Sequence, residues 1–173
     1  MDYLPFTYGV RGRSLREASP EEARTAYRNF LASIDDRLAQ LARLVGESGL
    51  RLDLTDASVD DLEQWFVSNI ERHLDDPRKL SRITNSLAID LGIYFGEVMI
   101  RRSPALAWLQ WPDSASPMFQ RQVISFSEVD TRDGWGVDIC MLVASYGLQY
   151  IDGNNPEKRF FSRLIREVVE AAE

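Results

Sequence analysis

Two carboxylic acids and a tyrosine interrupt the apolar stretch "IDLGIYFGEV" at positions 89–98. Asp90 and Glu97 stand seven residues apart, with Tyr94 between them. In a helix this spacing is two turns, so the three side chains would share a face, with about 10 Å between the backbones of the two acids. Side chains that lean toward each other would reach the separation at which inverting glycosidases use one carboxyl group as acid and the other as base. The pattern D-x-G-x-Y-x-G-E is therefore compatible with a carboxylate-dependent enzyme that acts on a small polar ligand.

The arginines that follow this motif admit two interpretations. In an enzyme, Arg101 or Arg102 would hold an anionic part of the substrate. In a purely structural helix, Glu97 would pair with Arg101, which lies at the favourable four-residue spacing, and Asp90 would cap or bond a neighbouring loop. We favour the structural interpretation, because buried ionised groups are more often paired than catalytic and the motif contains no third activating group.

The small residues of the same segment predict close packing. Ala88, Gly92 and Gly96 recur every four residues, so they line up on one side of a helix and leave a groove for another part of the backbone. Each glycine costs about 1 kcal/mol relative to alanine in a helix interior. A close helix or strand contact would explain that cost.

Composition bounds the class of protein. The 173 residues, 45% hydrophobic and 27% charged, are typical of one globular domain spanning 1–173. The net charge of −7 disfavours nucleic-acid binding and favours a basic partner. The single cysteine, Cys140, excludes an intrachain disulfide, and the single histidine, His73, excludes a multi-histidine metal site. We therefore predict no metal and no cofactor, and we place His73 at the C-terminal end of the second helix.

No apolar run in the sequence is recognisable as long enough to span a bilayer. The first residues, "MDYLPFTYGVRGRS", lack the order of basic and then apolar residues that marks a signal peptide. These features predict a cytoplasmic protein that is not associated with a membrane.

Hydrophobic periodicity predicts an α+β fold with about five helices around a buried central helix at 81–102. Apolar residues occur on most sides of that central helix. The segments 106–111 and 122–127 alternate in part with a period of two and contain β-branched and aromatic residues, so they predict neighbouring antiparallel strands. The segment 135–151 predicts a fourth helix, although its apolar run is also compatible with a buried strand.

Helix starts are marked by side chains that can accept from the first free backbone N–H groups. The strongest signal is Ser19, since Glu22 stands where the partner of a capping box belongs. Ser58 is the predicted cap of the second helix. Asn155 is the predicted cap of the last helix, with Pro156 as its first residue.

A protein-interaction module that binds a basic partner is the function that these features favour. Its candidate binding residues are Trp108, Trp111, Trp135 and Arg101, because aromatic side chains and arginine are enriched at protein interfaces. For at least two of the three tryptophans we expect ordinary core packing instead. The alternative remains the enzyme that would act through Asp90, Tyr94 and Glu97.

Two segments, "SLREASPEEARTAYRNFLASIDDRLAQL" and "SLAIDLGIYFGEVMIRRSPALAW", carry a resemblance to known proteins. Together they resemble a family of small, uncharacterised bacterial cytosolic proteins, in which the D-x-G-x-Y-x-G-E helix precedes a strand bearing a tryptophan. The similarity covers roughly two thirds of the chain and fades after Phe126. It implies no particular activity, but some similar proteins are of the immunity type or are other interaction modules, and the resemblance implies such a role here.

Overall fold

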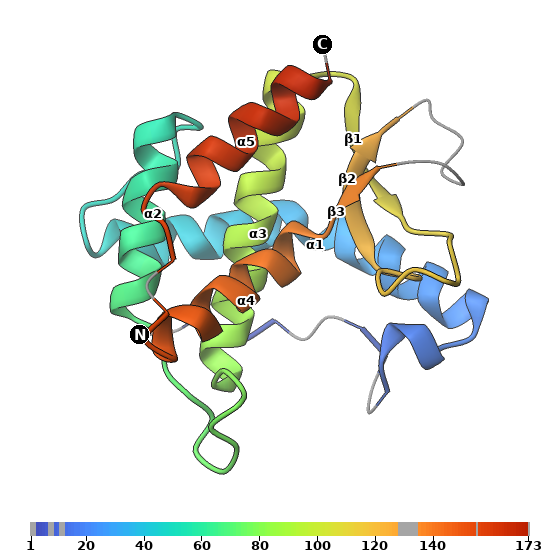
Figure 1. The fold of residues 1–173 in the computed structure, drawn as a ribbon, viewed down its shortest axis with the longest axis horizontal. Coiled ribbons are helices and arrows are strands. Elements are labelled where there is room, and N and C mark those ends of the chain that lie inside the picture. Colours follow the sequence, from blue (N-terminus) through green and yellow to red (C-terminus); the bar gives the residue numbers. More distant parts are fainter. Residues whose placement is uncertain (1–2, 7–8, 11–12, 128–134, 155, 173) are drawn as a thin grey trace.

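The computed structural model describes residues 3–6, 9–10, 13–127, 135–154 and 156–172 (Figure 1). These residues form five α-helices and a three-stranded antiparallel sheet, which confirms the predicted α+β class. After a short 3-10 turn, η1 (Leu15–Glu17), the elements are α1 (Pro20–Gly46), α2 (Asp56–Ser68), α3 (Arg82–Arg102), β1 (Leu106–Gln110), β2 (Gln122–Phe126), β3 (Gly136–Val137), α4 (Ile139–Ile151) and α5 (Phe160–Ala171).

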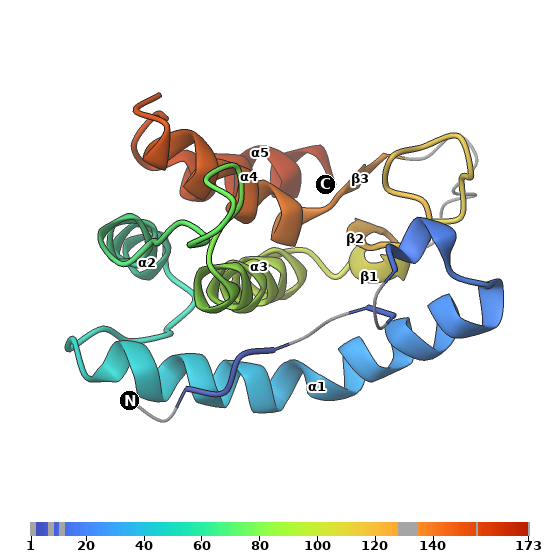
Figure 2. The same cartoon turned by 90° about the horizontal axis from the view of Figure 1, so that it is seen from below.

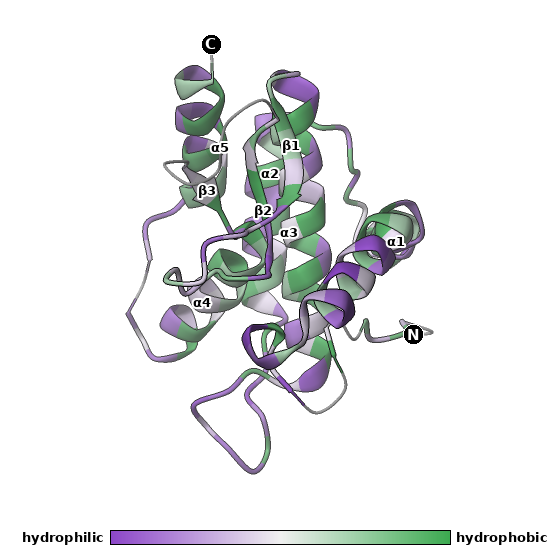
Figure 3. Cartoon of the chain, turned by 90° about the vertical axis from the view of Figure 1, so that its right-hand side faces the viewer, coloured by the Kyte–Doolittle hydropathy of each residue, from purple (hydrophilic) through white to green (hydrophobic). Residues whose placement is uncertain are grey.

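Helix α3 is the centre of the fold, as the sequence predicted. Figure 2 shows α1 along one side of it and α4 and α5 along the other. Leu91 and Ile93 point to nearly opposite sides of α3, and both are fully buried. Figure 3 shows hydrophobic residues along α3 and the strands beside it, whereas α1 alternates between hydrophobic and hydrophilic residues. One hydrophobic cluster joins residues of all five helices and of β1 and β2.

The prediction that no segment could span a bilayer is wrong by the criterion of length and composition. Within the described chain, α3 is the one helix long and apolar enough to do so. Of its most apolar window, 72% is buried inside the fold, as in the core helix of a globular protein. This buried position explains why α3 can be apolar on most sides.

The first helix begins at the predicted cap, Ser19. Ser19 accepts from the backbone N–H of Glu22, whose carboxylate accepts from the N–H of Ser19, and α1 ends at Gly46. The predicted start of the second helix is wrong, because Thr55 rather than Ser58 caps α2. Its hydroxyl oxygen accepts from the N–H of Ser58 and is itself positioned by Asp53, which lies two residues before it. Helix α2 also ends at Ser68, before the position of His73.

The predicted start of the last helix at Pro156 is also wrong, and its predicted cap, Asn155, lies outside the described residues. Helix α5 begins at Phe160, after Arg159 in the left-handed conformation (φ 60°). The physical reason is that Glu63 of α2 accepts hydrogen bonds from the backbone N–H groups of Arg159 and Phe161. A side chain from a distant helix thus supplies the cap that we expected from the chain just before α5.

The sheet confirms the predicted pairing of the two strand segments. Strands β1 and β2 are antiparallel neighbours, with Trp108 opposite Ile124. The third strand, β3, occupies the beginning of the segment predicted as a fourth helix, which starts only at Ile139 after the cap Asp138. Gly136 permits this path, since a Cβ atom there would lie 2.6 Å from the ring of Trp111.

Candidate functional site

Asp90 is fully buried and its carboxylate is occupied by other side chains of the protein. Arg37 of α1 binds it with two parallel hydrogen bonds, from Nε to Oδ1 at 2.8 Å and from Nη2 to Oδ2 at 2.6 Å. The hydroxyl of Tyr3 donates to Oδ2 at 2.5 Å. Paired bonds of this kind are the strongest type of ion pair, and they hold Asp90 against α1 rather than against a substrate.

The same arginine fastens the N-terminal segment to the helices. Arg37 Nη1 donates to the carbonyl oxygen of Leu4 at 2.9 Å, and the guanidinium group lies over the rings of Tyr3 and Phe6, 5.3 and 5.1 Å from their centroids. Ser86 of α3 accepts from the backbone N–H of Phe6. The buried network therefore joins α1, α3 and the segment 3–6.

The charged states of Asp90 and Arg37 depend on each other. Burial is the largest influence on Asp90 and raises the pKa of its carboxyl group, whereas hydrogen bonds from Arg37 and Tyr3 oppose that rise. Burial acts to lower the pKa of Arg37, but its bonds to Asp90 outweigh burial and raise it. Each ion is stable in the core because the other is present.

Tyr94 lies on the same helix as Asp90 but has different hydrogen-bond partners. Its hydroxyl accepts from the backbone N–H of Leu54 at 2.8 Å and forms a 2.7 Å hydrogen bond with the Ser58 hydroxyl. Leu54 has a φ of 66°, a conformation that side-chain-bearing residues rarely adopt. Tyr94 therefore stabilises the turn before α2.

Glu97 completes the motif without the predicted ion pair. Among the described residues no ion pair joins Glu97 to Arg101, which is exposed, so that prediction is wrong. The Glu97 carboxylate instead accepts from Trp108 Nε1 at 2.9 Å. The reason is the neighbouring Gly96, which lets the Trp108 ring lie against α3 and bring its N–H to Glu97.

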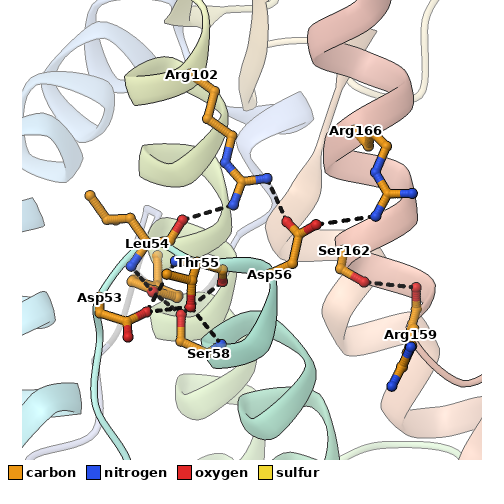
Figure 4. A network of polar contacts seen from close by, with 10 residues as sticks. Asp53, Leu54, Thr55, Asp56, Ser58, Arg102, Arg159, Ser162 and Arg166 are labelled. Atoms are coloured by element: carbon orange, nitrogen blue, oxygen red, sulfur yellow. Dashed lines mark hydrogen bonds and ion pairs between the residues drawn. The ribbon is translucent and has the colours of Figure 1, made fainter.

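Arg102 is engaged in connecting three helices (Figure 4). It donates to Asp56 Oδ1 at 2.6 Å and to the Leu54 carbonyl oxygen at 2.7 Å, and Arg166 of α5 donates to the other oxygen of Asp56 at 3.1 Å. These contacts hold the start of α2 against α3 and α5. The groups named in the enzyme hypothesis thus belong to separate structural contacts.

The predicted close packing at the two glycines of α3 is confirmed. A Cβ atom on Gly92 would lie 2.6 Å from the Cα atom of Cys140 in α4, and one on Gly96 would lie 2.3 Å from Trp108 Cζ2. Both distances are far shorter than a carbon–carbon contact allows. Glycine at these positions lets α4 and β1 approach α3.

The three candidate tryptophans divide into two groups. Trp108 and Trp111 are buried, which confirms core packing for at least two of the three candidates. Trp135 is 41% exposed, and its ring centroid lies 5.8 Å from that of Phe126. Of the three, only Trp135 offers a substantial aromatic surface.

A cleft that we did not predict lies between α2, the end of α4 and the segment before α5. Its volume is about 530 Å³, and its lining includes two acids, two bases and two aromatic rings: Asp60, Glu63, Lys158, Arg159, Tyr146 and Tyr150. The Glu63 carboxylate is occupied, since it accepts from the Tyr146 hydroxyl at 2.8 Å as well as from the α5 backbone. Asp60 differs, because its Oδ1 atom is buried and has no hydrogen-bond partner among the described residues.

Residues 3–138 match a family of unknown function, DUF6278. The chain belongs to this family. The match to DUF6278 includes the Arg37–Asp90 pair and both acids of the cleft, and it ends just before α4. Neither the curated proteins nor the solved structures contain a significant match.

The sequence of this DUF6278 protein contains no clear signal for the cleft. Asp60, Asp61 and Glu63 follow the predicted cap Ser58 closely, where acids commonly occur near a helix N-terminus, so they gave no sign of a site. Among the described residues, no three His, Cys, Asp or Glu side chains gather so that they could hold a metal ion.

The buried thiol of Cys140 is expected to affect stability at alkaline pH. Burial, with a smaller contribution from Asp138, raises the pKa of this thiol. Above about pH 9 the unfolded chain loses the thiol proton and the folded chain keeps it, so the stability present below that pH is lost by about 1.4 kcal/mol per pH unit. Urea unfolding at a series of pH values above about 9 should show that the free energy of unfolding falls less steeply with pH for Cys140→Ser than for the wild type. The other titrating groups are the same in both proteins. Equal slopes would contradict this assignment.

Proposed function

We propose that this protein is a protein-interaction module and that the cleft beside Asp60 binds a lysine or arginine side chain of a basic partner. The observation that carries the proposal is the buried Oδ1 atom of Asp60, which has no hydrogen-bond partner among the described residues. A buried acceptor without a donor costs free energy in the free protein, and a cationic donor from a partner would remove that cost.

The walls of the cleft suit such a cation. Tyr146 and Tyr150 contribute aromatic rings, and Tyr150 is 40% exposed. An ammonium or guanidinium group gains from both a carboxylate and an aromatic face. The net charge of −7 would attract a basic partner from a distance.

Two cationic residues of the protein itself, Lys158 and Arg159, line this cleft, and Arg159 is paired with Asp60. Arg159 Nε lies 3.3 Å from Asp60 Oδ2, and the Arg159 side chain is 78% exposed. An ion pair so exposed contributes little to stability, so an incoming cation can displace it at small cost. The contact indicates which chemical group the cleft accepts.

The enzyme hypothesis has less support. Asp90 is enclosed by Arg37 and Tyr3, while Tyr94 and Glu97 bond to other parts of the chain. An immunity-like role, in which the protein neutralises a basic partner in the bacterial cytoplasm, fits the cleft and the acidic charge. This role forms part of the proposal.

Binding to a labelled decapeptide of alternating lysine and glycine tests the proposal. Asp60→Asn should weaken binding about tenfold, because it removes a charge-assisted hydrogen bond. Asp61→Asn is the matched control, since it changes the net charge equally at an exposed neighbouring residue. Arg159→Ala should tighten binding by removing the competing cation. Equal effects of the two aspartate variants would show that only overall charge matters, and this would refute the proposal.

A further inference from the structure

A second cavity, separate from the cleft beside Asp60, lies where the N-terminal segment, α3, β2 and α4 meet. Its volume is about 250 Å³. Two arginines, Arg13 and Arg121, and two amides, Asn85 and Gln122, contribute to its lining, and the described lining residues include no carboxylate. Arg13 is paired with Glu22, and Arg121 is paired with Asp138. An anion would therefore be held by the arginine N–H groups that these pairs leave unbonded, rather than by a net positive charge.

Gln122 provides the clearest sign of a missing partner. Its side chain is only 1% exposed, and its Oε1 atom has no hydrogen-bond partner among the described residues. Buried amide oxygens are almost always bonded, since an unsatisfied one costs free energy. Gln122 is one of the residues that line the cavity, so an N–H group of a ligand there is the candidate partner for this oxygen.

Arg121 provides donors at the same cavity. Its Nε atom donates a hydrogen bond to the Asp138 carboxylate, and this contact fixes the orientation of the guanidinium group. The contacts of the described residues leave Nη1 and Nη2 of Arg121 without a hydrogen bond. Two parallel N–H donors suit a carboxylate, which binds such a fork with both oxygens.

We propose that this cavity binds a small carboxylate that also carries an N–H group. Arg121 would hold the carboxylate, and Gln122 Oε1 would accept from the N–H group. Ile89 and Met141 line the same cavity and provide apolar contact for the rest of the molecule. The volume is below the range of about 300–1,000 Å³ that is usual for drug-sized ligands, so the ligand has the size of an amino-acid derivative.

Three related probes separate the parts of this proposal. N-acetylglycine has both the carboxylate and the N–H group, N-acetylsarcosine lacks the N–H group, and N-acetylglycinamide lacks the carboxylate. Titrations followed by protein NMR should give N-acetylglycine the lowest dissociation constant, about tenfold below the other two. The perturbed signals should come from residues around Gln122 and Arg121.

Variants of Gln122 and Arg121 test the two proposed ligand contacts separately. Gln122→Met keeps the length of the side chain. It should weaken the binding of N-acetylglycine to the level of N-acetylsarcosine, and the affinity for N-acetylsarcosine should not change. Arg121→Gln should weaken the binding of N-acetylglycine but not the binding of N-acetylglycinamide. Circular dichroism verifies that this variant is folded. Asp60→Asn, in the other cleft, should affect none of them. No binding of N-acetylglycine at millimolar concentration, equal affinity for the three probes, or an unaffected Gln122→Met variant would each overturn the proposal.

Discussion

Replacing Arg37 with leucine is expected to lower the free energy of unfolding by about 3–5 kcal/mol, the cost of leaving one charge of a buried pair without its partner. Asp90 would lose two of its three hydrogen bonds while remaining in a fully buried position. The segment 3–6 would also lose the guanidinium group that holds the carbonyl oxygen of Leu4.

Urea unfolding of a small set of variants tests this expectation. Asp90→Leu should also be strongly destabilised, whereas the double variant should be closer to the wild type than either single variant, because neither charge remains. Arg24→Leu is the matched control, since Arg24 is an exposed arginine of the same helix. Additive losses, or a loss for Arg37→Leu no larger than for Arg24→Leu, would show that the pair is not a coupled unit.

The second large effect is expected at Gly92. Alanine there should lower the free energy of unfolding by about 1–3 kcal/mol through overpacking, although alanine favours a helix by about 1 kcal/mol over glycine. The new Cβ atom would meet the Cα atom of Cys140, which is backbone and cannot rotate away. Gly96→Leu should be destabilising for a related reason, since it would meet the ring of Trp108.

Gly46 is the matched control for this prediction. It is the last residue of α1, its φ is not positive, and nothing lies within 4 Å of a Cβ atom placed there. Gly46→Ala should therefore leave stability unchanged or raise it slightly. Thermal unfolding of both variants decides the matter, and a Gly92→Ala protein as stable as Gly46→Ala would contradict the close packing of α3 and α4.

The features predictable from sequence were those that depend on neighbouring residues. Ser19 and Glu22 form a cap within a single turn, so the start of α1 could be predicted. The spacing of Gly92 and Gly96 predicted close packing, because a four-residue repeat places both on one side of a helix. The alternating pattern of β1 and β2 was sufficient for their pairing.

Features that depend on distant residues could not be predicted. The partner of Asp90 is Arg37, which is 53 residues away and is one of 20 lysines and arginines. The start of α5 depends on Glu63 of α2, which the sequence near Asn155 does not reveal. The special position of Asp60 likewise exists only after α2, α4 and the segment before α5 have packed together.

The most direct test of the whole account compares Asp60→Asn with Asp90→Asn for both melting temperature and affinity for the lysine–glycine peptide. Asp60 is proposed to bind a partner, and Asp90 is held in a buried ion pair with Arg37. We predict that Asp60→Asn keeps the wild-type melting temperature and loses affinity, whereas Asp90→Asn melts at a clearly lower temperature and binds the peptide normally while folded. The opposite result, a stable Asp90→Asn protein that no longer binds and an Asp60→Asn protein that still does, would contradict the account.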